Sequence, residues 1–253
     1  MIASLPMYDR PETAGANERF WALIRDGLRA GGIAAPEALS RGGELFDHWL
    51  APDLVLSQSC GYPYRTRLHG RVALVGAPDY GVEGCAPGYY CSRIVARADD
   101  PRRRLSEFEG ARLAYNDPGS QSGWAALAAH APALARGPLV CTGGHAASAR
   151  AVAEGRAELA ALDAVSWALI ARAEPFAAGL RVVASTPPTP GLPLIAAQGA
   201  DAAALFEAVA AAIATLSEDD RTALMLRGLV PIAAEAYLAV PTPRPPGEFA
   251  RAG

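Results

Sequence analysis

The stretch NDPGSQSGWAAL, residues Asn116 to Leu127, decides the fold because it joins an apolar run to an alanine-rich segment through a polar turn that contains glycine. The apolar run before it, Arg112 to Tyr115, has the pattern of a buried strand, and the segment from about Ser122 has the composition of a helix. A helix begins with backbone N–H groups that lack intrahelical partners, and its dipole adds partial positive charge there. The stretch therefore predicts a strand, a turn and a helix start that can hold an anion.

The same order of elements recurs along the chain and predicts an α/β protein. A predicted strand at Leu139 to Cys141 leads into the turn Thr142-Gly143-Gly144-His145, and a helix follows from about Ala146. Several runs are continuously apolar, as in parallel strands that helices cover on both faces. The other predicted strands are Ile2 to Met7, Asp53 to Leu56, Val72 to Val75, Tyr89 to Ala96, Leu159 to Leu162, Arg181 to Ala184 and Leu194 to Ala196. The other predicted helices are Asn17 to Leu28, Val165 to Ala173, the segment from Leu205 to Leu216, and a last helix capped by Ser217.

Composition and charge exclude several classes of protein. The chain has 253 residues, of which 51% are hydrophobic, so it can bury a core as one large domain or two small ones. The net charge is −3, and the only dense basic run, Arg102 to Arg104, is flanked by acidic residues, so no nucleic-acid partner is expected. No window reaches the roughly 18 uninterrupted apolar residues of a membrane span, so we do not expect a membrane-spanning protein. The N-terminus has no positively charged leader, which predicts a periplasmic protein if the chain is the mature form and a cytoplasmic one if Met1 is the native start.

Two segments rich in glycine and proline divide the chain. Gly76 to Gly88 and Ser185 to Pro193 bracket about 100 residues, an ordinary size for a small domain. The second segment has four prolines, which remove backbone donors, so we expect an inter-domain strap outside any helix or sheet. We therefore predict a first lobe of residues 1–86 and 188–253 and a second lobe of residues 87–187. The proline- and arginine-rich C-terminal end is expected to be frayed.

The two glycine turns carry the first candidate site residues. Ser120, Gln121 and Ser122 add hydroxyl and amide donors to the N–H groups of their helix start. A serine N-cap alone would give the same pattern. His145 can donate to an anion, although a lone histidine is more often a cap or a surface residue.

Two further groups of candidates follow other predicted strands. Ser57, Gln58 and Ser59 come directly after the strand that ends at Leu56, where ligands of open α/β sheets usually bind. Asp163 comes directly after the strand that ends at Leu162, and it could equally be the N-cap of the next helix.

Six segments, in this order and spacing, resemble the substrate-binding proteins of phosphonate, phosphite and phosphate ABC transporters. They are SQSCGYPY from residue 57, APGYYCSRIV from 86, NDPGSQSG from 116, TGGHAASARAVAEG from 142, AALDAVSW from 160 and TPGLP from 189. The resemblance runs from about Asp53 to Pro193. Its most specific part is NDPGSQSG followed by the Gly-Gly-His turn.

The resemblance implies a two-lobed fold of the type II periplasmic-binding-protein class, with two mostly parallel sheets flanked by helices and a ligand cleft between the lobes. The ligand would be a small oxyanion such as phosphate, phosphite or a phosphonate, and the other implied partner is an ABC transporter permease. The turn Ser120, Gln121 and Ser122 would hold the phospho group, the motif histidine is His145, and Tyr89 would lie against the ligand. No catalytic residue, cofactor or metal is implied, and a monomer is expected.

The chain departs from the family pattern at three positions. Leu192 stands in Pro190-Gly191-Leu192-Pro193 where aminoalkylphosphonate binders resemble Pro-Gly-Asp-Pro, so a ligand with an ammonium group is not expected. Gln121 replaces a small hydroxyl residue of the turn, and Ser57 replaces an aromatic residue. These changes leave the ligand's identity open.

Two other classes of function remain open on the sequence. In an enzyme on the same fold, His145 and Asp163 could form a proton-transfer pair, with Cys60, Cys91 or Cys141 as a nucleophile. No Ser-His-Asp spacing, metal-ligand cluster or cofactor fingerprint accompanies them. A ligand-sensing subunit would need a separate chain for its output. Cys85 and Cys91 are close enough to form a disulfide in an oxidising compartment, whereas reduced, buried cysteines are the ordinary interpretation.

Overall fold

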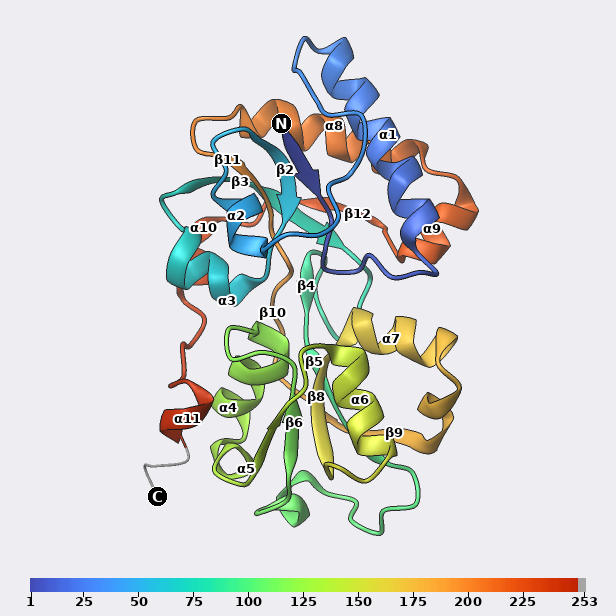
Figure 1. Cartoon of the computed structure of the whole chain (residues 1–253), viewed down its shortest axis with the longest axis vertical. Coiled ribbons are helices and arrows are strands. Elements are labelled where there is room, and N and C mark those ends of the chain that lie inside the picture. Colours follow the sequence, from blue (N-terminus) through green and yellow to red (C-terminus); the bar gives the residue numbers. More distant parts are fainter. Residues whose placement is uncertain (250–253) are drawn as a thin grey trace. The chain divides into compact units, whose positions relative to one another are not determined.

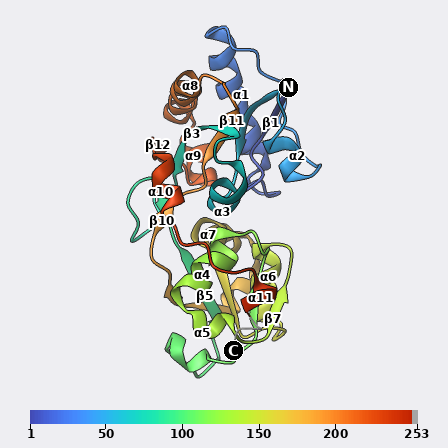
Figure 2. The ribbon, with the colours of Figure 1, turned by 90° about the vertical axis from the view of Figure 1, so that its left-hand side faces the viewer.

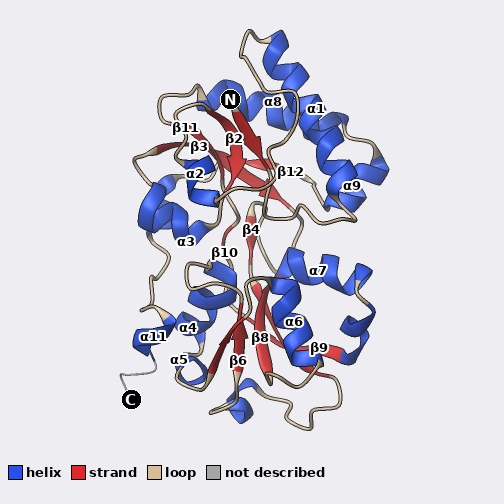
Figure 3. Ribbon diagram, in the orientation of Figure 1, coloured by secondary structure: helices blue, strands red, loops and turns tan. Residues whose placement is uncertain are grey.

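A computed structural model describes residues 1–249, and its contacts divide the chain into two compact units (Figure 1). Unit 1 contains Met1–Tyr89 and Pro190–Ala239, and unit 2 contains Tyr90–Thr189 together with residues 240–249. Each unit has its own sheet and its own helices (Figure 3). The protein is therefore an α/β protein in which unit 1 is discontinuous in sequence.

Unit 1 is built on a five-stranded sheet with the strand order β1-β2-β11-β3-β12. β1 (Ile2–Ser4) and β2 (Leu54–Gln58) are parallel, whereas β11 (Leu194–Ala197) runs antiparallel to β2 and to β3 (Val72–Asp79). β12 (Gly228–Val230) closes one edge antiparallel to β3. The sheet is thus mixed, with only the β1–β2 pair parallel, so the prediction of a mostly parallel sheet is wrong for unit 1. β11 and β12 run against β1, β2 and β3, a direction that an apolar run does not reveal.

Helices cover both faces of this sheet, since neighbouring strand residues alternate between two apolar clusters. One cluster lies under α1 (Ala14–Ala30), α8 (Ala202–Thr215) and α9 (Glu218–Leu224). The predicted amphipathic face of α1 is buried there, with Ile24 fully covered. The other cluster lies under the short elements α2 (Leu45–Trp49), η1 (Tyr64–Leu68) and α10 (Ala234–Leu238). The short helix α3 (Gly61–Pro63) leads directly into η1.

Unit 2 contains a second five-stranded sheet, with the strand order β7-β6-β8-β5-β9. β7 (Leu139–Cys141), β6 (Leu113–Tyr115) and β8 (Leu159–Asp163) are parallel neighbours. β5 (Ser92–Arg97) runs antiparallel to both β8 and β9 (Leu180–Ser185). Only β5 runs against the others, so this sheet is mostly parallel, as predicted.

Two apolar clusters also cover the two faces of the second sheet. α6 (His145–Ala153), α7 (Ala164–Ala173) and η4 (Pro175–Gly179) pack on one face, which contains Val95 and Leu162. The other face packs against η2 (Leu105–Phe108), α4 (Ala126–His130) and α5 (Pro132–Ala135). Alanine lines much of the α6 face, which lets the helix lie close to the strands.

The proline-rich strap contains a strand, which the sequence did not predict. β10 (Thr189–Pro190) pairs with β4 (Tyr89–Tyr90) in a separate two-stranded sheet, and the chain passes from one unit to the other at both strands. Proline is tolerated there because a two-stranded sheet has free edges, so a missing N–H costs no ladder bond. The predicted strand from Tyr89 to Ala96 is accordingly split at Cys91.

The C-terminal segment, residues 240–249, packs with unit 2, whereas the sequence predicted a frayed end and placed it in the first lobe. The indole Nε1 of Trp124 donates to the Arg244 carbonyl at 3.0 Å, and Pro246 is buried. A short helix, α11 (Pro246–Phe249), follows (Figure 2). These residues belong to unit 2. The sequence could not show this, because the acceptor is a backbone carbonyl that any residue would supply.

Candidate functional site

Unit 2 gathers polar residues at one edge of its sheet. β6, β7 and β8 are parallel, so their carboxyl ends lie at the same edge. β5 is antiparallel to β8, and its first residue, Ser92, pairs with Asp163 at that edge. The turns after β6 and β7 and the start of α7 therefore come together in unit 2.

Hydrogen bonds join the two glycine turns to each other. The Thr142 N–H donates to the Tyr115 carbonyl at 2.9 Å, and the Gly143 N–H donates to the Asn116 carbonyl at 2.9 Å. The Thr142 hydroxyl lies 2.6 Å from the hydroxyl of Ser148, inside α6. The turn that starts α6 is therefore fixed against the turn that follows β6.

The turn after β6 leads into a π-helical turn, η3 (Gln121–Ala125), rather than directly into an α-helix. Ser120 is its N-cap, and the Gly123 N–H donates to the Ser120 hydroxyl at 3.0 Å. A Cβ atom at Gly123 would collide with Oδ1 of Asn116, so any other residue there would require the Asn116 side chain to move. Single π-turns are rare in proteins as a whole, but many of those that do occur lie at functional sites.

The structure brings Ser122 and His145 together. Ser122 Oγ lies 3.1 Å from His145 Nε2. Nδ1 of His145 is buried and has no hydrogen-bond partner among residues 1–249. Burial lowers the pKa of His145 from 6.5 to about 4. The imidazole is therefore neutral at neutral pH, so one ring nitrogen donates and the other accepts.

Ser120 and Asp163 each cap the start of a helix, which was the alternative to ligand binding in the sequence analysis. Oδ1 of Asp163 accepts from the N–H groups of Val165 and Ser166 at 2.8 and 2.9 Å, at the start of α7. Its side chain is 2% exposed. Gln121 is similarly buried. Contact of any of these residues with a ligand stays a prediction.

In unit 1 the three polar residues at the end of β2 differ in how their side chains are engaged. Ser57 Oγ lies 2.7 Å from Ser4 Oγ, and the Gln58 amide donates to the Tyr80 hydroxyl at 2.9 Å. Ser59 is fully buried, and its Oγ has no hydrogen-bond partner in the described part of the chain. Tyr89, in β4, is partly buried and packs against the apolar cluster of unit 1 that contains Tyr237 of α10.

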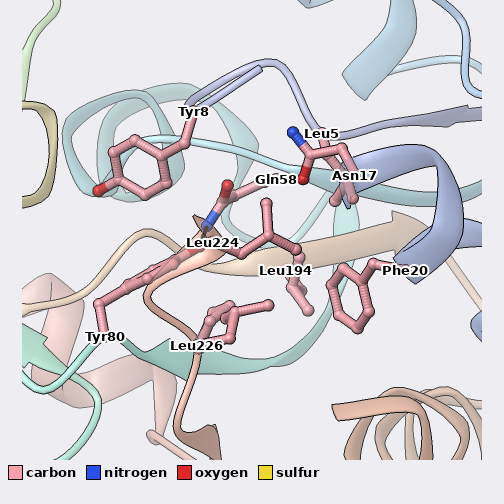
Figure 4. Close-up of a pocket in the computed structure, with 10 residues that line it drawn as sticks. Leu5, Tyr8, Asn17, Phe20, Gln58, Tyr80, Leu194, Leu224 and Leu226 are labelled. Atoms are coloured by element: carbon pink, nitrogen blue, oxygen red, sulfur yellow. Dashed lines mark hydrogen bonds between the residues drawn. The ribbon is translucent and has the colours of Figure 1, made fainter. Parts of the chain in front are cut away.

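A small pocket lies beside Gln58 in unit 1 (Figure 4). Its walls are mainly apolar, and Tyr8, Asn17 and Tyr80 add polar groups. The cavity volume is about 20 Å³, room for roughly one water molecule. That is less than a five-atom oxyanion needs, so the pocket is not by itself an anion site.

Sequence reasoning missed two residues of the unit 2 edge. Oδ1 of Asn116 is buried without a hydrogen-bond partner among the described residues, and it packs against Gly123. Its position as the first polar residue after a strand could have identified it. Ser92 gave no such signal, because it lies in what the sequence predicted as a continuous strand.

Three features of the described residues concern other kinds of site: the cysteines, groups of metal-binding side chains, and helices long enough to cross a membrane. No disulfide joins any of the four cysteines, which all lie within residues 1–249, and of the four only Cys91 is buried. Across residues 1–249, no group of three or more His, Cys, Asp or Glu side chains could hold a metal ion. In the same range, no helix has the length and apolar character required to cross a membrane.

Comparison with solved structures identifies the class of fold. PhnD1 from Prochlorococcus marinus, in complex with methylphosphonate, superposes with a TM-score of 0.70 at 13% identity over 99% of this chain and 97% of that one. XAC2383 from Xanthomonas citri, bound to chloride ion, gives 0.64 at 17% identity over 99% and 96%. A binding-protein component of an ABC phosphonate transporter from Pseudomonas aeruginosa gives 0.62 at 14% identity over 93% and 82%. The chain therefore has the two-lobed α/β fold of type II periplasmic binding proteins.

The family follows from the sequence itself. Residues 52–237 match the model of the family described as ABC transporter, phosphonate, periplasmic substrate-binding protein. Because this match spans well over half of the chain, the protein belongs to that family, whose members bind a solute for a transporter. No match was found among curated protein sequences.

Proposed function

We propose that this protein binds a small oxyanion such as phosphate, phosphite or a phosphonate, as a solute-binding protein and not as an enzyme. The observation that carries the proposal is the Ser122–His145 pair, which lies where two joined turns start helices. Helix starts offer N–H donors and partial positive charge, and a neutral imidazole and a hydroxyl add donors of adjustable direction. Membership of the phosphonate-binding family supports a phospho group as the anion.

The principal contacts should be made by polar residues that keep hydrogen-bonding capacity beyond their contacts within the protein. We propose that role for Ser122 and His145 in unit 2 and, separately, for Ser59 and Tyr89 in unit 1. The remaining predicted site residues shape the turns, since most of their side chains have internal partners; they are Ser57, Gln58, Ser120, Gln121 and Asp163.

The preferred ligand should carry a small uncharged substituent or none. Leu192, where aminoalkylphosphonate binders have an acid, is 4% exposed and offers no charge to a ligand ammonium group. A buried ammonium group without a charged partner would cost several kcal/mol. By family we further propose a periplasmic protein that delivers its ligand, as a monomer, to an ABC transporter permease.

The test is thermal unfolding of the purified protein with phosphate, phosphite, methylphosphonate, 2-aminoethylphosphonate and sulfate. A ligand at 100 times its Kd stabilises the folded state by about 2.7 kcal/mol, which raises Tm by several degrees. We expect a rise with at least one of the first three anions and a smaller one with 2-aminoethylphosphonate. If none of the five anions shifts Tm, the proposal is wrong.

Two variants then locate the site. Ser122→Ala and His145→Ala should each raise Kd about 10- to 100-fold, because hydrogen bonds to charged groups contribute about 1.5–3 kcal/mol. His130→Ala, at the exposed end of α4, is the matched control and should leave Kd unchanged. Mass spectrometry of the recovered ligand decides between binding and catalysis, since an enzyme would convert it.

A further inference from the structure

We propose that Ser92 is a positioning residue for the anion site, because its hydroxyl fixes the backbone of Ser122 and thereby the Ser122–His145 pair. This inference rests on the proposed function, in that the pair is the part of the site that it positions. Its contacts all lie within unit 2.

The first contact joins Ser92 to the π-turn. Ser92 Oγ donates to the Ser122 carbonyl at 2.9 Å, and both residues are buried, with exposures of 1% and 3%. If the peptide of Ser122 rotated, it would leave a buried hydroxyl and a buried carbonyl unsatisfied, which costs about 1–3 kcal/mol for each group. The bond therefore holds the carbonyl of Ser122 in one direction.

A second pair of contacts keeps Ser92 itself in place. The Ser92 N–H donates to the Thr186 hydroxyl at 3.0 Å, and the Thr186 N–H donates to the Ser92 carbonyl at 3.0 Å. Thr186 is 4% exposed and directly follows β9. Ser92 is also paired with Asp163 across β5 and β8. Because its backbone is bonded on both sides, Ser92 cannot follow Ser122 if the turn moves.

These bonds form a continuous chain from Thr186 through Ser92 and Ser122 to His145. The direction of the Ser122 side chain decides whether its hydroxyl faces Nε2 of the imidazole, and loss of this contact would change the relative stability of the two tautomers. A neutral histidine presents a donor on one side only, so its tautomer decides whether an anion meets a donor or an acceptor. Ser92 thus controls donor geometry although it is not itself proposed to touch the ligand.

The experiment compares Ser92→Ala, Ser92→Cys and Ser92→Thr with the wild type. Cysteine keeps most of the volume and donates only weakly, whereas threonine keeps the hydroxyl. The buried Ser166 of α7 supplies the matched control, Ser166→Ala. The first readout needs no ligand: 15N NMR of the His145 imidazole reports its tautomer and its pKa. The second is the Kd for inorganic phosphate and for methylphosphonate.

We expect Ser92→Ala and Ser92→Cys to mix the two tautomers, to move the His145 pKa upward and to raise Kd about 10-fold. Ser92→Thr should leave the imidazole signals and Kd close to their wild-type values, and Ser166→Ala should change neither. The double variant Ser92→Ala/Ser122→Ala should have a Kd less than twice that of Ser122→Ala alone, because Ser92 acts on the ligand only through Ser122. Wild-type imidazole signals in both Ser92→Ala and Ser92→Cys would overturn the inference. If no anion binds the wild type, the proposed function fails, while the imidazole signals still decide the role of Ser92.

Discussion

At the scale of single residues, His145 combines a buried ring nitrogen with a depressed pKa. A group whose folded pKa lies below its unfolded value stabilises the protein fully above the unfolded pKa and loses that contribution as the pH falls towards the folded value. For His145 these limits are 6.5 and about 4. Between them the unfolded chain binds a proton that the folded chain does not, so folding becomes less favourable at lower pH.

We therefore predict that Tm falls as the pH is lowered from 6.5 to 4, and that His145→Gln makes this part of the curve flatter. Glutamine retains a polar group that can reach Ser122 but does not titrate. Arginine and backbone partners hold the pKa values of Asp100 and Glu107 at about 2, so these carboxyls stay charged in the folded protein throughout this window. In the unfolded chain they begin to take up protons near their ordinary pKa values of 3.8 and 4.5, so they add a slope near pH 4 that both proteins share. Differential scanning calorimetry of both proteins at half-unit pH steps measures the effect. Parallel curves would show that His145 is not the titrating group.

At the scale of elements, the strand-turn-helix units were predictable, whereas their internal contacts were not. The strand Leu139–Cys141 has its predicted bounds, and α6 and α7 each start within a residue of the predicted position. Short apolar runs bounded by glycine turns suffice for that. The π-turn at Gln121–Ala125 was not predicted, because apolar periodicity does not distinguish a π-turn from the first turn of an α-helix.

The role of Asp163 can be tested at this scale, because the cap of α7 and a ligand contact predict different outcomes. Asp163→Ala should lower the free energy of unfolding by about 1–2 kcal/mol, since two N–H groups lose their acceptor. Asp163→Asn keeps an acceptor oxygen and should recover most of that loss. Urea unfolding measures both. If Asp163 only caps the helix, the Asn variant binds phosphate as the wild type does, whereas a changed Kd would identify Asp163 as part of the anion site.

At the scale of the whole molecule, two observations were beyond sequence reasoning. Ser92 joins Ser122 across 30 positions of sequence, and nothing in the local pattern of either residue specifies the other. The C-terminal end was interpreted as frayed because its prolines and arginines match no helix or strand pattern. Backbone carbonyls bind regardless of side chain, so composition carries no information about the bond that holds this end to Trp124.

That bond makes the C-terminal segment part of unit 2, and a chain that ends at Ala239 should show it. Trp124 is fully buried in the π-turn, and truncation removes the carbonyl to which its indole N–H donates. We expect a loss of about 1 kcal/mol or more in the free energy of unfolding, with weaker binding of phosphate because the turn carries Ser122. Tryptophan fluorescence during urea unfolding measures the first effect and calorimetric titration the second. Arg244→Ala is the matched control: it retains the backbone carbonyl and should behave as the wild type. A truncated protein with an unchanged free energy of unfolding and an unchanged Kd would show that the segment contributes neither to the stability of unit 2 nor to phosphate binding.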